Sequence, residues 1–254
     1  MHHVTSADGT SIAYDSVGEE PPVICLHGTG VTRHIWYGVA DHLADSQATL
    51  LLPDRRGRGE SGDTLPWDFE RELEDVAALA ETVDGPVSVF GSSYGGLLAL
   101  RAAEQLPIER LLLFEPPMPK EVVAPDDEYE SLATRVRDRL NGGDREGAVR
   151  LFFEEATGAS NVESWPIWPD CVELAETIAR ESAFVEQFEL GNPDITVPVL
   201  ALQGKYSPEY LQRGVSVLAE RLPNTTTVEI ESSHAGVVTA PAAVADAVGQ
   251  FLRE

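Results

Sequence analysis

Residues 87–100 read VSVFGSSYGGLLAL, a short apolar run that passes through a glycine-rich turn into a stretch of helix-forming residues. Within it, residues 91–95 match the pattern G-x-S-x-G, with Ser93 at the centre. This pattern is typical of a sharp strand–turn–helix bend, in which the central residue is strained and its side chain stands above the sheet. We predict a strand over 87–90, a helix over 94–105 and a nucleophilic hydroxyl on Ser93, whereas Ser92 has no such placement.

The segments on either side of this turn alternate between strand-like and helix-like patterns. Predicted strands cover residues 11–17, 23–26, 49–52, 110–114, 197–202 and 225–230. Predicted helices cover residues 32–43, 69–83, 208–221 and 241–252, and Asp8-Gly9 predicts a hairpin turn. The alternation favours an α/β fold, with a mostly parallel sheet and helices on both faces.

The alternation stops between residues 116 and 195, which hold helical patterns and no clear strand. A capping signal at Asp126-Asp127 predicts a helix over 128–140. A second helical pattern covers 145–157 and ends at Gly158, and a third covers 172–188. We predict a core made of residues 1–115 and 196–254, interrupted by a helical insertion over 116–195. Six of the aromatic residues in the insertion lie at spacings that more often fill a core than line a pocket: Phe152, Phe153, Trp165, Trp168, Phe184 and Phe188.

A serine hydroxyl is a weak nucleophile and needs a base. His234 lies in ESSHAG, between the last predicted strand and the last helix, which places it at the same sheet edge as Ser93. The other histidines fit this role less well. His2 and His3 lie at a terminus that we expect to fray, His34 and His42 fall in the first predicted helix, and His27 belongs to a glycine-rich loop.

An acyl-transfer site also needs donors for an oxyanion. Residues 27–30, HGTG, follow an early strand and form a loop whose N–H groups can point at the same pocket. We predict that the backbone N–H groups of Thr29 and Tyr94 form the oxyanion hole.

Six stretches, taken in chain order, resemble the α/β-hydrolase superfamily: DGTSIAY, VICLHGTG, LLPDRRGRGESG, FGSSYGG, VLALQGKYSP and SSHAG. The chain looks like the single-domain esterase, lactonase and C–C hydrolase type of this superfamily. The resemblance implies a mostly parallel eight-stranded sheet, a Ser–acid–His triad in that order and a helical cap inserted after the sixth strand. It implies no metal or cofactor, and the chain has no H-E-x-x-H pattern, Cys/His cluster or dinucleotide-type glycine loop.

One position departs from the superfamily's pattern. The family usually places an aspartate three residues after a glycine that here is Gly204, and this chain has Ser207 instead. Three alternatives remain open: Glu115, Glu209, or a site without an acid. We favour Glu115, because it interrupts an apolar strand and precedes two prolines, where a charge without a partner is costly.

The composition is strongly acidic, with 254 residues, a net charge of −25 and a sequence pI of about 4.4. Such a chain repels nucleic acid and anionic membranes. The acids of residues 69–83, among them Glu72 and Asp75, predict a solvated helix face, and the acidic surface resembles that of proteins from salt-accumulating microbes. The two cysteines, Cys25 and Cys171, lie far apart, and no signal peptide is recognisable, so we expect free thiols and a cytoplasmic location.

These observations predict a serine hydrolase that cleaves a small, uncharged ester, thioester or lactone through an acyl-enzyme on Ser93, acting as a monomer or homodimer. Two alternatives remain open. A C–C hydrolase, lyase or cofactor-free oxygenase could use the same fold, and a non-catalytic protein could bind a small ligand on it.

Overall fold

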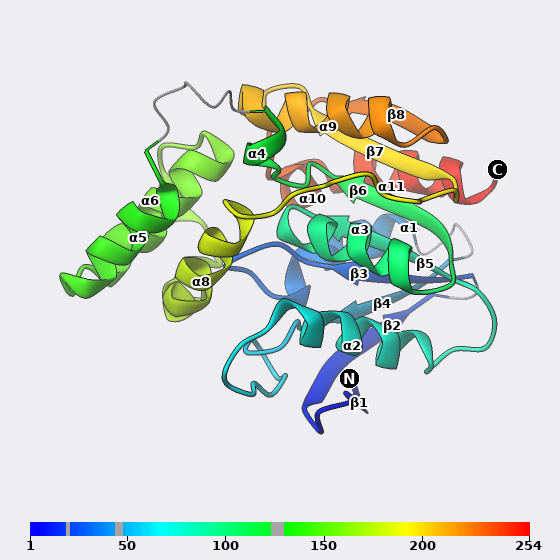
Figure 1. Cartoon of the computed structure of the whole chain (residues 1–254), viewed down its shortest axis with the longest axis horizontal. Coiled ribbons are helices and arrows are strands. Elements are labelled where there is room, and N and C mark those ends of the chain that lie inside the picture. The colour runs from blue at the N-terminus through cyan, green and yellow to red at the C-terminus, as the bar shows by residue number, and fades with distance from the viewer. Residues whose placement is uncertain (19–20, 44–47, 123–129) are drawn as a thin grey trace.

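The computed structural model describes residues 1–18, 21–43, 48–122 and 130–254 (Figure 1). Its centre is an eight-stranded sheet with the order β1-β2-β4-β3-β5-β6-β7-β8. The strands are β1 (His2–Thr5), β2 (Ser11–Val17), β3 (Pro22–Leu26), β4 (Thr49–Pro53), β5 (Val87–Ser92), β6 (Ile108–Phe114), β7 (Val199–Gly204) and β8 (Thr225–Ile230). β2 pairs antiparallel with both β1 and β4, and all other neighbours are parallel. The predicted mostly parallel, eight-stranded sheet is confirmed.

Helices cover both faces of the sheet. One face packs against α1 (Tyr37–Leu43), α10 (Gly236–Thr239) and α11 (Pro241–Leu252), and the other against α2 (Phe69–Ala80), α3 (Tyr94–Gln105) and α9 (Glu209–Arg221). Every residue of β3 and β5 is buried, as expected for strands that are covered from both sides. None of the helices in the described ranges has the length and apolar character that crossing a bilayer requires.

A group of helices lies between β6 and β7. It comprises α4 (Pro119–Val122), α5 (Leu132–Asn141), α6 (Arg145–Thr157), the short 3₁₀ helix η2 (Val162–Ser164), α7 (Trp168–Glu173) and α8 (Ala175–Val185). Over residues 116–122 and 130–198 this segment contains no strand. Helices α5, α6 and α8 lie beyond one edge of the sheet, in green and yellow-green in Figure 1, and bury a third hydrophobic cluster of their own.

Three local expectations need correction. His2 and His3 do not fray, because they belong to β1, which pairs with β2 across the predicted Asp8-Gly9 hairpin. The predicted helix over 32–43 is a 3₁₀ turn, η1 (Arg33–Trp36), followed by α1, and the one over 172–188 is divided at Leu174 between α7 and α8. The capping signal Asp126-Asp127 lies outside the described residues, and α5 begins with Ser131 Oγ accepting a hydrogen bond from the N–H of Thr134.

The topology brings several loops to one place. Strands β3, β5, β6, β7 and β8 run parallel, so their carboxyl ends meet at the same edge of the sheet. The residues that follow these ends include the HGTG loop, Ser93, Glu115, Ser207 and His234. In open α/β sheets this edge is where ligands bind.

Candidate active site

Ser93 occupies the bend between β5 and α3. Its backbone has φ 53° and ψ −123°, which non-glycine residues rarely adopt, and its N–H donates to the Phe114 carbonyl at 2.9 Å. The flanking glycines permit the bend. A Cβ on Gly91 would lie 2.2 Å from the Gly95 carbonyl oxygen, and a Cβ on Gly95 would lie 2.1 Å from that of Leu26. The bend therefore requires glycine at both positions and leaves the Ser93 side chain partly exposed.

His234 lies in the loop between β8 and α10 and contacts a buried carboxylate. Its Nδ1 is 2.8 Å from Oε2 of Glu115, the residue directly after β6. Because a carboxylate oxygen accepts, Nδ1 carries a proton, and in the neutral imidazole the lone pair is then on Nε2. This is the tautomer that a base for a serine hydroxyl needs.

Three hydrogen bonds hold the fully buried Glu115 carboxylate. Besides His234, the Ser207 hydroxyl donates to Oε2 at 2.8 Å and the Gly204 N–H donates to Oε1 at 2.8 Å. Glu115 has φ 44°, the second positive value at a non-glycine residue beside that of Ser93. Ser207, which stands where the superfamily usually has its acid, thus bonds to the carboxylate that lies beside the histidine. Glu209, the other candidate, is exposed at the start of α9.

Ser93, His234 and Thr29 line the same space. Across the described ranges no hydrogen bond joins Ser93 to His234, although both side chains line two adjoining cavities of about 290 and 270 Å³. Catalytic hydrogen bonds are often long in unliganded sites and shorten when substrate binds. The HGTG loop reaches the serine, because a Cβ on Gly28 would lie 3.1 Å from Cβ of Ser93.

Two backbone N–H groups near Ser93 are available to a ligand. Tyr94 is the first residue of α3, so its N–H has no acceptor within the helix. The N–H of Thr29 has no hydrogen-bond partner in the part of the chain that the structure describes. Thr29 also lines both cavities.

The two cavities differ in character. The cavity of about 290 Å³ has charged residues in its wall, including Glu130, Arg135 and Glu155. The cavity of about 270 Å³, which we call the apolar cavity, is lined mainly by hydrophobic side chains, among them Val31, Ile35, Phe152, Phe153, Trp165, Ile167, Val237 and Val238.

The six aromatic residues of the insertion named above divide between the core and the pocket. Phe152, Phe153 and Trp165 line the apolar cavity, which is the less favoured of the two roles, and they also belong to or pack against the hydrophobic cluster of the insertion. Phe184 stacks on Phe69 with ring centroids 4.2 Å apart. The last two pack against hydrophobic clusters, Phe188 against that of the sheet and Trp168 against that of the insertion.

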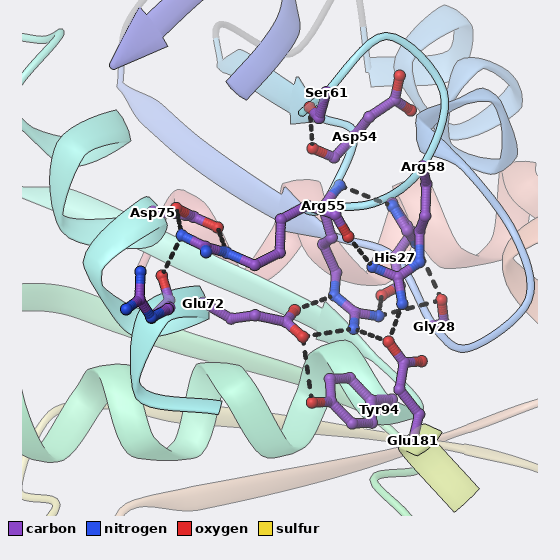
Figure 2. A network of polar contacts seen from close by, with 12 residues as sticks. His27, Gly28, Asp54, Arg55, Arg58, Ser61, Glu72, Asp75, Tyr94 and Glu181 are labelled. Carbon is purple, nitrogen blue, oxygen red and sulfur yellow. Dashed lines mark hydrogen bonds and ion pairs between the residues drawn. The ribbon is translucent and has the colours of Figure 1, made fainter. Parts of the chain in front are cut away.

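A buried network of ion pairs lies beneath the HGTG loop (Figure 2). Arg55 bonds Glu72 at 2.9 Å and Glu181, on α8, at 2.5 Å, and Arg58 also pairs with Glu181. These four side chains are at most 3 % exposed. Two guanidinium groups therefore face two carboxylates, which suits a site that water does not reach.

The expected solvated face of α2 is wrong for two of its acids. Glu72 and Asp75 are buried, because Arg55 and Arg56 turn inward from the loop after β4 and pair with them. Burial raises the pKa of Glu72, but the charges of Arg55 and Arg58 outweigh it and lower that pKa to about 2. Glu70 and Glu74, on the same helix, are exposed as expected.

His27 is neutral and braces the loop. Its Nδ1 lies 2.9 Å from the Gly28 carbonyl, which only accepts, and its Nε2 lies 3.0 Å from the Arg55 N–H, which only donates. Burial and the nearby Arg55 and Arg58 charges hold the pKa of His27 well below its usual range. His27 therefore cannot replace His234 as the base.

Sequence reasoning missed Arg55, Arg58 and Glu181 as parts of the site. The available signal was the stretch DRRGRGESG, which concentrates three arginines in five residues of a chain with only 18 basic residues. Such a concentration of arginines in an acidic protein indicates that they pair with carboxylates. It does not indicate which ones, because Glu181 lies 126 residues away from Arg55 in the sequence.

Comparison with known proteins agrees with this architecture. A sequence model described as "Alpha/beta hydrolase family" matches residues 23–247. The crystal structure of an alpha/beta hydrolase from Sphaerobacter thermophilus is similar over 99 % of this chain and 100 % of that one, with 34 % identity and a TM-score of 0.86. A pimeloyl-[acyl-carrier protein] methyl ester esterase of Aeromonas salmonicida is 26 % identical over 95 % of this chain and 99 % of its own. The lipase LipV of Mycobacterium tuberculosis is 34 % identical over 37 % of this chain and 36 % of its own. The chain therefore belongs to the alpha/beta hydrolase family.

Proposed function

We propose that this protein is a serine hydrolase that cleaves small, uncharged carboxylic esters, including thioesters and lactones, through an acyl-enzyme on Ser93. The observation that carries the proposal is the 2.8 Å contact between His234 Nδ1 and Glu115 Oε2, at a cavity that Ser93 also lines. Relatives named as an esterase and a lipase support ester chemistry.

In the proposed reaction His234 Nε2 takes the Ser93 proton as Oγ attacks the acyl carbon. The N–H groups of Thr29 and Tyr94 donate to the resulting oxyanion, and Glu115 stabilises the imidazolium. Collapse expels the alcohol or thiol, which receives its proton from His234. Water then attacks the acyl group with the same histidine as base, which releases the acid and restores Ser93.

The apolar cavity supports an apolar acyl or alcohol portion in the substrate. Its volume of about 270 Å³ falls just below the range of about 300–1,000 Å³ that is common for ligand pockets, which suits a short chain or a single ring. The net charge of −25 disfavours polyanionic substrates by repulsion. In this proposal residues 116–195 form the cap that sets substrate size, over a core of residues 1–115 and 196–254.

The test combines an activity-based probe with a series of p-nitrophenyl esters from acetate to decanoate. We expect a fluorophosphonate to label Ser93 in the folded protein, and Ser93→Ala to lose labelling and hydrolysis. We expect kcat/KM to rise about fourfold for each methylene group buried, and to level off once the apolar cavity is full.

Ser88→Ala is the matched control, because Ser88 is buried at the other end of the same strand. It is expected to keep both labelling and activity. A folded protein that neither reacts with the probe nor cleaves any ester would contradict the proposal and favour one of the two alternatives, cleavage of another bond or simple ligand binding.

A further inference from the structure

Arg55 is hydrogen-bonded to the HGTG loop through both its side chain and its backbone. Its guanidinium Nη1 donates to the carbonyl oxygens of His27 at 3.1 Å and Gly28 at 3.3 Å. Its backbone N–H donates to Nε2 of His27, whose Nδ1–H donates in turn to the Gly28 carbonyl. The Gly28 carbonyl oxygen therefore accepts two hydrogen bonds, and both depend on Arg55.

The Gly28 carbonyl and the Thr29 N–H belong to one planar trans peptide, so they point in opposite directions. Fixing the carbonyl toward Arg55 therefore fixes the Thr29 N–H away from it, on the side of the cavity that Ser93 lines. The same guanidinium lies 4.1 Å from the ring centroid of Tyr94, whose N–H is the second proposed donor. One side chain thus contacts both halves of the proposed oxyanion hole.

The rest of this guanidinium is bound to carboxylates. Nε and Nη2 donate to Glu72 at 2.9 and 3.4 Å, and Nη2 also donates to Glu181 at 2.5 Å. All five N–H groups of Arg55 are therefore used, an arrangement that lysine cannot reproduce. Glu181 lies on α8, within the insertion, and is fully buried.

We propose that Arg55 is the positioning residue of the oxyanion hole, and that its bond to Glu181 makes the direction of the Thr29 N–H depend on the seating of helix α8. This inference rests on the proposed function, because it needs the Thr29 N–H to receive the oxyanion. When α8 is in its observed position, Glu181 binds Nη2 of Arg55, and Nη1 of the same side chain binds the carbonyl groups of the HGTG loop. A movement of α8 would weaken the bond to Glu181 and with it the hold of Arg55 on the loop.

The test compares two inhibitors of equal chain length, a trifluoromethyl ketone and the matching methyl ketone. In the first, Ser93 Oγ forms a bond to the carbonyl carbon, the π pair becomes an oxyanion and the serine proton passes to His234. The methyl ketone binds without that charge. The preference ratio, defined as the inhibition constant of the methyl ketone divided by that of the trifluoromethyl ketone, measures how strongly the site stabilises the oxyanion. A general loss of packing would weaken both inhibitors and leave this ratio unchanged.

We expect Arg55→Lys to lower both this ratio and kcat by about ten- to a hundredfold, which is at most the effect of removing one oxyanion-hole donor. The KM is expected to stay within about threefold of the parent's, because the substitution disturbs the position of a donor and not the binding of the substrate. Arg56→Lys is the matched control. Arg56 is the next residue, is equally buried and pairs with Asp75, but none of its hydrogen bonds reaches the HGTG loop. It is expected to change stability without changing the ratio. Glu181→Gln, which retains Arg55, is expected to lower the ratio by a smaller factor.

The outcomes separate the inference from the function beneath it. If the parent protein does not prefer the trifluoromethyl ketone, the proposed function fails. If the parent prefers it and Arg55→Lys does so equally, only the positioning role is overturned. Loss of the preference in Arg55→Lys with full preference in Glu181→Gln overturns the link to α8. Should Arg55→Lys fail to fold, Glu181→Gln decides, and an unchanged ratio there overturns the proposal.

Discussion

Among single residues, Glu115 shows how a charge can be kept inside an apolar sheet edge. Its two carboxylate oxygens accept hydrogen bonds from the Gly204 N–H, the Ser207 hydroxyl and His234, so the buried carboxylate has three donors.

The positions of Ser93 and His234 at this sheet edge could be predicted from local sequence patterns. Glu115 is favoured among three alternatives by its place at the end of the neighbouring strand and by the cost of an unpartnered carboxylate next to two prolines. The supporting role of Ser207 could not, because it depends on the register of β6 against β7.

Exchange of this carboxylate for an amide tests its role. We expect Glu115→Gln to lower kcat by about 10³- to 10⁴-fold, because the amide favours the wrong histidine tautomer and cannot stabilise an imidazolium. Steady-state hydrolysis of the best ester, with a thermal melt to show folding, checks it. Glu209→Gln, at the exposed alternative position, is expected to stay within about twofold. A loss in Glu209→Gln instead, or in neither variant, would assign the acid elsewhere or remove it from the mechanism.

Among the elements, local patterns and long-range contacts differ in how far the sequence predicts them. Helices α3, α6 and α11 and strand β8 carry their periodicity and end signals within themselves, and all four have the bounds predicted from the sequence. The inward turn of Arg55 and Arg56 could not be predicted, because their partners lie on α2 and α8. An acidic helix face looks the same in sequence whether water or arginine covers it.

The pH dependence of stability tests the contact between Arg55 and α2. The pKa of Glu72 falls from an ordinary 4.5 to about 2, so folding favours the ionised carboxylate. The resulting stabilisation is complete above pH 4.5 and is lost as the pH falls toward 2. We expect Glu72→Gln to melt at a lower temperature at neutral pH and to lose less of its Tm than the parent on acidification. Thermal melts across this window measure both effects.

Glu74→Gln provides the control for that experiment, since Glu74 lies on the same helix with its side chain exposed. Its Tm is expected to follow the parent's at every pH. Equal slopes for the parent and Glu72→Gln would mean that the ion pair contributes nothing to acid sensitivity.

For the whole molecule, the dominant quantity is surface charge. The buried charged residues of the described ranges are four arginines and five acids, namely Arg33, Arg55, Arg56, Arg58, Asp54, Glu72, Asp75, Glu115 and Glu181. The five acids outnumber the four arginines by one, so the large negative excess of the described residues lies on side chains outside the buried core. Self-repulsion on this scale opposes the compact state, and salt weakens it.

We expect the Tm of the protein to rise with KCl, first steeply as screening sets in near 0.1 M and then gradually toward molar salt, as the hypothesis of adaptation to high salt requires. Calorimetry along a KCl series measures this, and a sucrose series separates screening from a general solute effect. A Tm that is flat or falling up to molar KCl would contradict the hypothesis and leave the acidity as ordinary surface solvation.

The bond between Arg55 and Glu181 also limits how the two parts of this protein can be recombined. A chimaera that carries the insertion of another hydrolase, grafted between β6 and β7, would lose Glu181 and leave Arg55 and Arg58 with Glu72 as their main counter-charge. Removing one partner from a buried ion pair typically costs about 3–5 kcal/mol. A successful graft would therefore have to supply a carboxylate at the equivalent turn of its last helix, which makes that turn the first criterion for choosing a donor.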